Sequence, residues 1–282
     1  MSDHLRVLVT GAGGMLAHDL VPALRTAGHV VTAMGRDDLD VTDPDVCTAA
    51  AVGHDLVVNC AAWTRVDDAE SHEQEAFAVN AVGAANVARG AADAGARLAH
   101  LSTDYVFDGQ STLPYAAEHP PSPRSAYGRT KLAGEWAVRA LCANSWVLRT
   151  AWLYGAGGPN FVTTMLRLAG KRDTLDVVDD QLGQPTWTRD LADLIVRMIA
   201  ADAPAGIYHG TSSDETTWHG LARAVLEARG LDPERVRPTT TDAFPRPAPR
   251  PAYSVLSHAT LEVAGVTPIR DWRSALAEYL QS

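Results

Sequence analysis

The first half of the chain alternates short apolar runs with longer segments that have a helical spacing of apolar residues. The apolar runs are rich in valine and leucine, which is typical of buried parallel strands. They lie at residues 5–10, 29–34, 55–60, 98–102 and 145–150. Helical patterns follow them, the longest at residues 73–94. This alternation predicts an α/β fold with a doubly wound parallel sheet.

The pattern becomes less regular after residue 155. Helices are predicted at residues 160–170, 189–201, 217–229 and 271–281, with short strands at 175–178 and 207–210. The proline-rich stretch at 238–251 predicts an irregular, extended loop. We therefore expect one large domain and a small C-terminal lobe. The domain comprises residues 1–150 and about 185–207, and the lobe comprises 151–184 and 208–282.

A glycine-rich turn follows the first apolar run and precedes a helical pattern. Its spacing is Gly11-x-x-Gly14-x-x-Ala17. In this setting, glycines let the backbone approach a pyrophosphate, and the helix N-terminus supplies amides and a positive dipole. The motif predicts a Rossmann-like, dinucleotide-binding first domain, although a tight turn that binds nothing is an alternative. The expected contacts to the cofactor come from Gly11, Gly13, Gly14, Met15 and Leu16.

The end of the second predicted strand bears on the choice of cofactor. Gly35 and Arg36 stand where an acid often binds the ribose 2′-hydroxyl of NAD, and an arginine there suits the 2′-phosphate of NADPH. This favours NADPH, although Asp37 or Asp38 could still reach a ribose and accept NADH. Further candidates for cofactor contacts come from four segments along the domain. They are Asp40 and Val41 near the adenine, Ala61 and Ala62 after the third strand, Asn80, and Ser102.

A Tyr-x-x-x-Lys pair opens the helix predicted after the fourth strand. Tyr127 and Lys131 are four residues apart, so a helix places the phenol and the ammonium on one face. A neighbouring cation lowers the pKa of a phenol and makes it a usable general acid. Thr103 and Asp104 follow the fourth strand, at the carboxyl edge where such sheets bind ligands. A surface tyrosine beside a solvated lysine is the alternative.

Composition narrows the range of partners. The chain has 282 residues, of which 46% are hydrophobic and 21% charged, as in an ordinary globular protein. A net charge of −10 argues against nucleic acid or an anionic membrane as the main partner. The three cysteines have no metal-binding spacing, and no apolar run approaches the roughly 20 residues of a membrane span. We expect a cytoplasmic protein and predict no metal site.

Several longer motifs carry a resemblance to a known family. STDYVFDG, YGRTKLAGE and VVDDQLGQPTWTRDLA resemble the dTDP-4-dehydrorhamnose reductases, within the extended short-chain dehydrogenase/reductases. The similarity covers nearly the whole chain. It implies reduction of the C4 ketone of a dTDP-linked 4-keto-6-deoxy sugar by NADPH, with NADH possible. It also implies that Tyr127 donates a proton, Thr103 binds the ketone oxygen, and Lys131 holds the nicotinamide ribose.

The resemblance also implies which residues contact the substrate, and a few residues differ from the family pattern. It implies sugar contacts by Asp104, Val106 and Trp152, and contacts to the nucleotide diphosphate by Asn160, Gln181 and Arg250. Trp152 could instead be a core residue, and Arg250 could be solvated. Trp63 and Arg65 depart from the usual residues, which suggests a reshaped loop. Some relatives form magnesium-bridged dimers through glutamates, but the aligned residues here are Asp19 and Arg189, so that metal site is not predicted. A homodimer is possible.

Two other functions remain open. A nucleotide-sugar 4,6-dehydratase or 4-epimerase has the same fold, but a dehydratase needs an extra acid where this chain has Tyr105 after Asp104. A non-catalytic, NADP-binding regulatory subunit is the second alternative. Retention of Thr103, Tyr127 and Lys131 argues for an enzyme, and turnover assays would decide.

Overall fold

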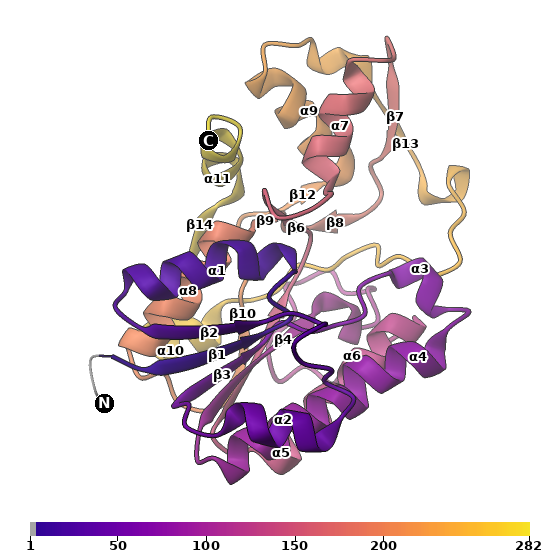
Figure 1. Ribbon diagram of the computed structural model, residues 1–282. Coiled ribbons are helices and arrows are strands. Elements are labelled where there is room, and N and C mark those ends of the chain that lie inside the picture. Colours follow the sequence, from indigo (N-terminus) through magenta and orange to yellow (C-terminus); the bar gives the residue numbers. More distant parts are fainter. Residues whose placement is uncertain (1–3) are drawn as a thin grey trace.

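A six-stranded parallel sheet forms the centre of the larger layer of the protein (Figure 1). The structure is a computed structural model, and it describes residues 4–282. The strand order is β10-β5-β4-β3-β1-β2, so the order reverses between β1 and β3. The strands are β1 (Arg6–Thr10), β2 (Val30–Met34), β3 (Leu56–Asn59), β4 (Arg97–Thr103), β5 (Ser145–Thr150) and β10 (Gly206–His209). The predicted doubly wound sheet is confirmed.

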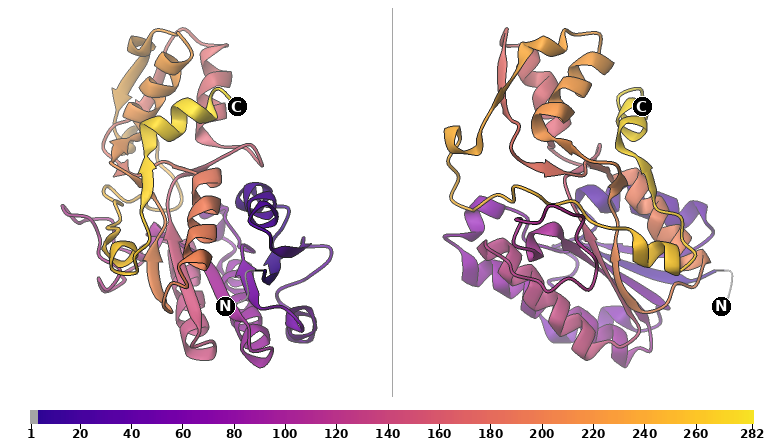
Figure 2. Two further views of the ribbon diagram at one scale, coloured as in Figure 1. Left: turned by 90° about the vertical axis from the view of Figure 1, so that its left-hand side faces the viewer. Right: turned by 180° about the vertical axis from the view of Figure 1, so that it is seen from behind.

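Helices cover both faces of this sheet, as Figures 1 and 2 show. One face carries α1 (Met15–Thr26) and α8 (Thr188–Ala200). The opposite face carries α2 (Pro44–Ala51), α5 (Ala84–Asp93) and α6 (Ala126–Leu141). The smaller helices α3 (Val66–Ala69) and α4 (Glu73–Phe77) lie beside α6.

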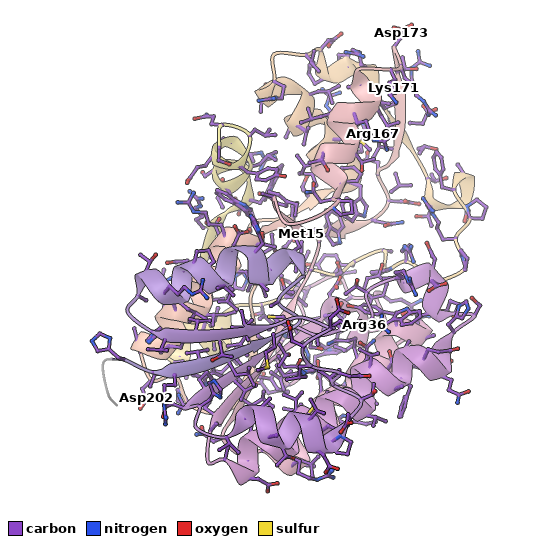
Figure 3. All side chains as sticks on the ribbon, viewed as in Figure 1. Met15, Arg36, Arg167, Lys171, Asp173 and Asp202 are labelled. Carbon is purple, nitrogen blue, oxygen red and sulfur yellow. The ribbon has the colours of Figure 1, made fainter. Side chains whose placement is uncertain are left out.

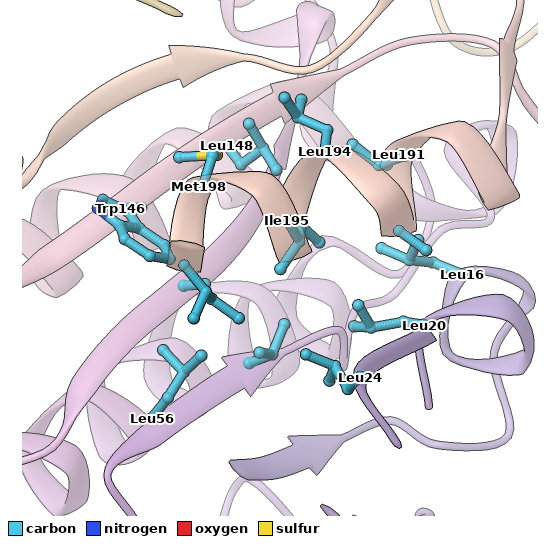
Figure 4. Packing of buried hydrophobic residues seen from close by; sticks show 14 of the residues in the cluster. Leu16, Leu20, Leu24, Leu56, Trp146, Leu148, Leu191, Leu194, Ile195 and Met198 are labelled. Carbon is cyan, nitrogen blue, oxygen red and sulfur yellow. The ribbon is translucent and has the colours of Figure 1, made fainter. Parts of the chain in front are cut away.

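The core between α1, α8 and the sheet explains why these elements form (Figure 4). Leu16, Leu20 and Leu24 recur every four residues of α1, so they share one face and are all buried. They pack with leucines and isoleucines of α8 and with residues of β3 and β5. Ala17, the small residue of the glycine motif, is also buried in this cluster. The motif therefore seats α1 closely on the sheet.

The single helix predicted at residues 73–94 is interrupted. A π-helical turn, η1 (Ala78–Gly83), separates α4 from α5. The turn brings the backbone of η1 against α6: a Cβ on Gly134 would lie 2.1 Å from the carbonyl oxygen of Asn80. Sequence periodicity could not predict the extra residue in this turn, because the close approach to α6 is a long-range contact.

The C-terminal part of the chain builds a smaller lobe above the carboxyl edge of the sheet (Figures 1 and 2). A core of its own holds the lobe together, with Tyr154, Trp187 and Trp272 among its largest buried residues. The helices are α7 (Phe161–Ala169), α9 (Trp218–Ala228) and α11 (Trp272–Tyr279). The strands are β6 (Leu153–Tyr154), β7 (Leu175–Val178), β8 (Leu182–Gly183), β9 (Thr186–Trp187), β11 (Ser212–Ser213), β12 (Thr216–Thr217), β13 (Val236–Thr239) and β14 (Ile269–Asp271).

Two segments differ from the sequence-based expectation. The proline-rich stretch is not irregular throughout, because β13 includes Pro238 and pairs with β7, and η4 (Thr241–Ala243) follows. Residues 259–263, which were assigned to the small lobe without a predicted helix, form α10 (Ala259–Val263), and Leu261 packs into the core of the large sheet. None of the helices within residues 4–282 is long and apolar enough to cross a membrane.

Candidate active site

A cleft of about 1180 Å³ lies between the carboxyl edge of the sheet and the small lobe. Ligand pockets commonly measure about 300–1,000 Å³, so this cleft has room for more than one small ligand. It lies where the strand order reverses, as expected for this type of sheet. The predicted site residues that line it are Gly11, Gly13, Gly14, Met15, Leu16, Arg36, Asp40, Val41, Ala61, Ala62, Ser102, Thr103, Asp104, Tyr127, Lys131, Trp152, Gln181 and Arg250.

The glycine-rich turn forms one end of the cleft and fits a pyrophosphate. Gly11 has φ +66°, and a Cβ there would lie 2.6 Å from the amide nitrogen of Ala61. A Cβ on Gly13 would meet nothing within 4 Å, so open space remains above the turn. No side chain caps α1 at Gly14, which leaves the first amides of the helix available to an anion.

Arg36 is the cationic side chain that follows β2 at this end of the cleft (Figure 3). Asp37 and Asp38, the acids left open as ribose ligands, are not among the residues that line the cleft, whereas Asp40, predicted near the adenine, does line it. The carboxylate of Asp38 accepts a hydrogen bond from the amide of Gly35 at 2.9 Å. Asp40 accepts hydrogen bonds from the amide and hydroxyl of Thr42, at 2.9 and 2.8 Å. This arrangement favours a phosphate over a bare ribose beside Arg36.

Replacing Arg36 by alanine should therefore change the preference between cofactors. The Km for NADPH should rise by about 10-fold, equivalent to roughly 1–2 kcal/mol for a lost charged hydrogen bond, while the Km for NADH stays nearly constant. Initial rates with each cofactor at saturating sugar nucleotide would measure the two effects. Asp37→Ala is the control on the same exposed turn. Equal changes for both cofactors would show that Arg36 does not contact the 2′-phosphate.

The Tyr-x-x-x-Lys pair lies at the start of α6, as the spacing predicts. The hydroxyl of Ser125 caps this helix by accepting a hydrogen bond from the amide of Gly128 at 3.0 Å. Gly128 is required there, because a Cβ would lie 2.2 Å from the carbonyl oxygen of Tyr105. The Nζ of Lys131 donates to the carbonyl oxygen of Leu101 at 2.6 Å. These contacts hold the helix against the end of β4, and the side chains of Tyr127 and Lys131 line the cleft.

The pKa values of the pair correct one sequence-based expectation. Burial raises the pKa of Tyr127 to about 12, and the proximity of the Thr103 hydroxyl acts against this rise. Burial also lowers the pKa of Lys131 to about 8, while the charge of Glu135 opposes that change. The predicted lowering of the phenol pKa by Lys131 is wrong for this structure, because the ammonium is directed to the Leu101 carbonyl and desolvation dominates.

Asp104 is a buried carboxyl at the lining of the cleft. Its Oδ1 accepts a hydrogen bond from the hydroxyl of Thr103 at 2.9 Å, and hydrogen bonds from the Ser254 side chain and from backbone amides also lower the pKa of this carboxyl. The side chain is buried, and this burial raises the pKa of Asp104 to about 6. Desolvation therefore outweighs these hydrogen bonds at this position of the lining.

The raised pKa of Asp104 predicts a pH-dependent stability. Between about pH 4 and 6 the folded protein keeps a proton that the unfolded chain has lost, so stability falls as the pH rises. Asp104→Asn removes this titration, so its stability relative to wild type should increase by about 2 kcal/mol from pH 4 to pH 7. Urea unfolding at several pH values would measure the gain. Asp37→Asn, at an exposed site, serves as the control, and parallel curves for Asp104→Asn and wild type would contradict the expectation.

Behind the pair, a buried ion pair joins α6 to β5. Arg149 donates through Nε and Nη2 to both oxygens of Glu135, at 2.9 and 2.7 Å. The hydroxyl of Ser102 donates to Oε1 of the same carboxylate at 2.5 Å. Ser102 lines the cleft, but its hydroxyl hydrogen is thus directed to Glu135 and not to a ligand. The ion pair fixes α6 relative to the strand ends that carry Thr103 and Thr150.

Three predicted site residues lie outside the cleft lining. Asn80 is buried and ties the loop after β3 to α6, because its side chain bonds to the backbone of Trp63 and to the hydroxyl of Thr130. Val106 is fully buried in a small core with Phe107 and its neighbours. Asn160 caps α7 and also donates to the carbonyl of Gly155 at 2.8 Å. Their side chains have structural partners, which argues against the predicted ligand contacts.

Other residues that line the cleft were not anticipated. Trp218 and Phe161, the first residues of α9 and α7, bring aromatic rings to the lobe side. Arg246 lies in the proline-rich stretch, and Asp67, in α3, accepts a hydrogen bond from Arg250 at 2.8 Å. No ligand contact was predicted from the sequence for any of these four residues. A cap residue immediately before each aromatic is the one signal that could have placed Trp218 and Phe161 at helix starts.

The fold and the cleft together define an NAD(P)H-dependent oxidoreductase of the short-chain dehydrogenase/reductase class. A glycine-rich turn, a Tyr-x-x-x-Lys pair and a threonine at the end of β4 share one cleft of a doubly wound sheet. The chain belongs to the family described by the RmlD substrate binding domain, which matches residues 5–282. The family resemblance seen in the sequence is confirmed.

Individual relatives agree with this assignment. A dTDP-4-dehydrorhamnose reductase from Streptomyces griseus is 52% identical over 280 residues, covering 97% of this chain and 92% of that protein. A dTDP-4-keto-6-deoxy-D-glucose reductase from Streptomyces niveus is 50% identical over 276 residues, covering 97% of this chain and 96% of that protein. The crystal structure of a Bacillus anthracis dTDP-4-dehydrorhamnose reductase in complex with NADP has a TM-score of 0.95 at 34% identity, covering 99% of each chain.

Proposed function

We propose that the protein uses NADPH to reduce the C4 ketone of a dTDP-linked 4-keto-6-deoxy sugar. This proposal rests on one observation: the same cleft is lined by the glycine-rich turn and by Thr103, Tyr127 and Lys131. The names of the Streptomyces relatives support the substrate class. The relative crystallised with NADP supports the cofactor.

The residues around the turn suit the parts of the cofactor. The amides at the start of α1 would hold the pyrophosphate, Arg36 the 2′-phosphate, and Lys131 the nicotinamide ribose. When bound, NADPH supplies the hydride, and the protein orients the ketone against it. The open space above Gly13 accommodates a group that approaches the backbone closely.

The proton is assigned to Tyr127. Because its pKa is raised to about 12, the phenol stays protonated at neutral pH. The alkoxide that forms at C4 is a stronger base than a phenolate, so proton transfer from Tyr127 is favourable. Thr103 would hydrogen-bond the same oxygen, and Asp104 and Trp152 would contact the sugar. Gln181 and Arg250 remain candidates for the diphosphate end.

We also assign the two parts of the chain to the two ligands. Residues 1–150 and about 185–207 would bind the dinucleotide, and residues 151–184 and 208–282 would supply most of the sugar-nucleotide contacts. The position of α10 on the large sheet is an exception to this division. We also propose that the protein acts in the cytoplasm, where NADPH is supplied.

The rival enzymatic function has less support. A dehydratase needs a second acid after Asp104, but Tyr105 follows. The ring of Tyr105 packs edge-on against that of Tyr127, with ring centroids 5.6 Å apart.

A turnover assay tests the alternative that the protein is a non-catalytic regulatory subunit. Purified protein would be incubated with NADPH and dTDP-4-keto-6-deoxy sugars that differ at C2 and C3, and products identified by NMR. Binding of NADPH without oxidation in the presence of every sugar would contradict the proposed function.

A further inference from the structure

Trp152 has a backbone conformation that tryptophan seldom adopts. Its φ is +47°, in the left-handed region that favours glycine. The residue stands just after β5 and lines the cleft that also holds Thr103 and Tyr127. Strained backbone of this kind persists where the surrounding structure holds it, and it is common at ligand-binding sites. The neighbours that hold Trp152 therefore bear on function.

Two elements of the small lobe fix the ring of Trp152. The indole of Trp218 stacks on it with ring centroids 3.6 Å apart and planes 8° apart. Gly183 lies against the same ring, where a Cβ would come within 2.6 Å of a ring carbon. Strands β8 and β12 pair antiparallel, with Thr216 opposite Gly183. The ribbon thus supplies Gly183, and Trp218 follows directly after its strand β12 as the first residue of α9.

Trp218 is itself held in a defined orientation. Its Nε1 donates to Oε1 of Gln181 at 3.1 Å, and Nε2 of Gln181 donates to the hydroxyl of Thr241 at 3.0 Å. Phe161 packs against the indole with ring centroids 4.6 Å apart. The hydroxyl of Thr217 caps α9 by accepting a hydrogen bond from the amide of Gly220 at 3.0 Å. These contacts leave the ring of Trp218 little freedom, so it can act as a rigid support.

We propose that Trp218 is a positioning residue, which holds Trp152 in the strained conformation that presents its indole to the sugar. The inference rests on the proposed function, because it assumes that a sugar nucleotide occupies the cleft. Gln181 then acts through Trp218, and Gly183 provides the space that the ring of Trp152 needs. The small lobe thereby sets the shape of the sugar pocket at the carboxyl edge of the large sheet.

The direct test compares Trp218→Ala with Trp218→Phe. Alanine should raise the Km for the sugar nucleotide at least 10-fold and leave the Kd for NADPH within twofold of wild type. Phenylalanine keeps a stacking ring and should recover most of the affinity. Two stacked indoles also couple in the near-ultraviolet circular dichroism spectrum, and this coupled signal should vanish in both variants. Trp136 lies on α6 and is 60% exposed, so Trp136→Phe is the control for the spectrum and should retain the coupled circular dichroism signal.

A double-mutant cycle asks whether Trp218 acts through Trp152. In a Trp152→Ala background, Trp218→Ala should raise the Km by less than twofold further. Gly183→Ala, which crowds the Trp152 ring from the ribbon, should raise the Km in the wild type and have little effect in the same background. This variant also tests the inference if Trp218→Ala does not fold.

The outcomes separate this inference from the proposed function. Unchanged Km values in Trp218→Ala and Gly183→Ala would overturn the positioning role while wild-type turnover still supported the reductase. The positioning role would also be overturned if Trp218→Ala and Gly183→Ala raised the Km as much in the Trp152→Ala background as in the wild type. Absence of wild-type turnover with every 4-keto sugar would contradict the proposed function, and the inference, which depends on it, would fall with it.

Discussion

Replacing Tyr127 by phenylalanine should lower kcat by about 10²–10⁴-fold, the usual range for loss of a general acid. The phenol supplies its proton only as the alkoxide develops, so the loss is confined to transition-state stabilisation. Phenylalanine keeps the ring and its edge-on contact with Tyr105, so the Kd for NADPH should change little. Single-turnover oxidation of NADPH and cofactor titration would measure the two quantities.

A control variant separates the proton donor from its neighbours. Tyr105→Phe removes a half-buried phenol beside Tyr127, but this residue has no assigned proton transfer, so kcat should fall by less than about 10-fold. A Tyr127→Phe enzyme with near wild-type kcat on a verified 4-keto substrate would show that another group supplies the proton.

Replacing Arg149 by methionine should lower the free energy of unfolding by about 3–5 kcal/mol, because it leaves the Glu135 carboxylate buried without its cation. Both side chains are 2% exposed, so water cannot replace the lost partner. For a chain of this size the loss corresponds to a fall in Tm of roughly 5–15 °C. Urea unfolding and thermal melts would measure the effect.

The chain offers a matched control for this ion pair. Arg129 donates to both oxygens of Glu73 at 2.8 Å, but those side chains are 46% and 44% exposed. Arg129→Met should therefore cost at most about 1 kcal/mol. Glu135→Leu combined with Arg149→Met should recover part of the lost stability, because the carboxylate is no longer buried without its cation, although Lys131 loses the supporting charge of Glu135. Equal losses for Arg129→Met and Arg149→Met would contradict the argument.

The small lobe contributed most of what the sequence did not predict. Trp152 was anticipated as a sugar contact, but its partner Trp218 belongs to a distant helix without a motif. Asn160 was assigned to the diphosphate, yet it lies outside the cleft lining and caps α7. Gln181, assigned to the same end, lines the cleft and also accepts a hydrogen bond from the indole of Trp218, which the sequence did not indicate. Polar side chains of this kind have many potential partners, and only the packed structure selects among them.

By itself, the sequence determined the large sheet, the glycine-rich turn and the shared helix face of Tyr127 and Lys131. These features depend on apolar periodicity and on the spacing of a few residues, which are local properties. Tertiary structure alone decided the break at η1, the burial that raises the pKa of Tyr127, and the stack of Trp218 on Trp152. Each of these depends on desolvation or close approach between segments far apart in the chain, and no local pattern encodes such contacts.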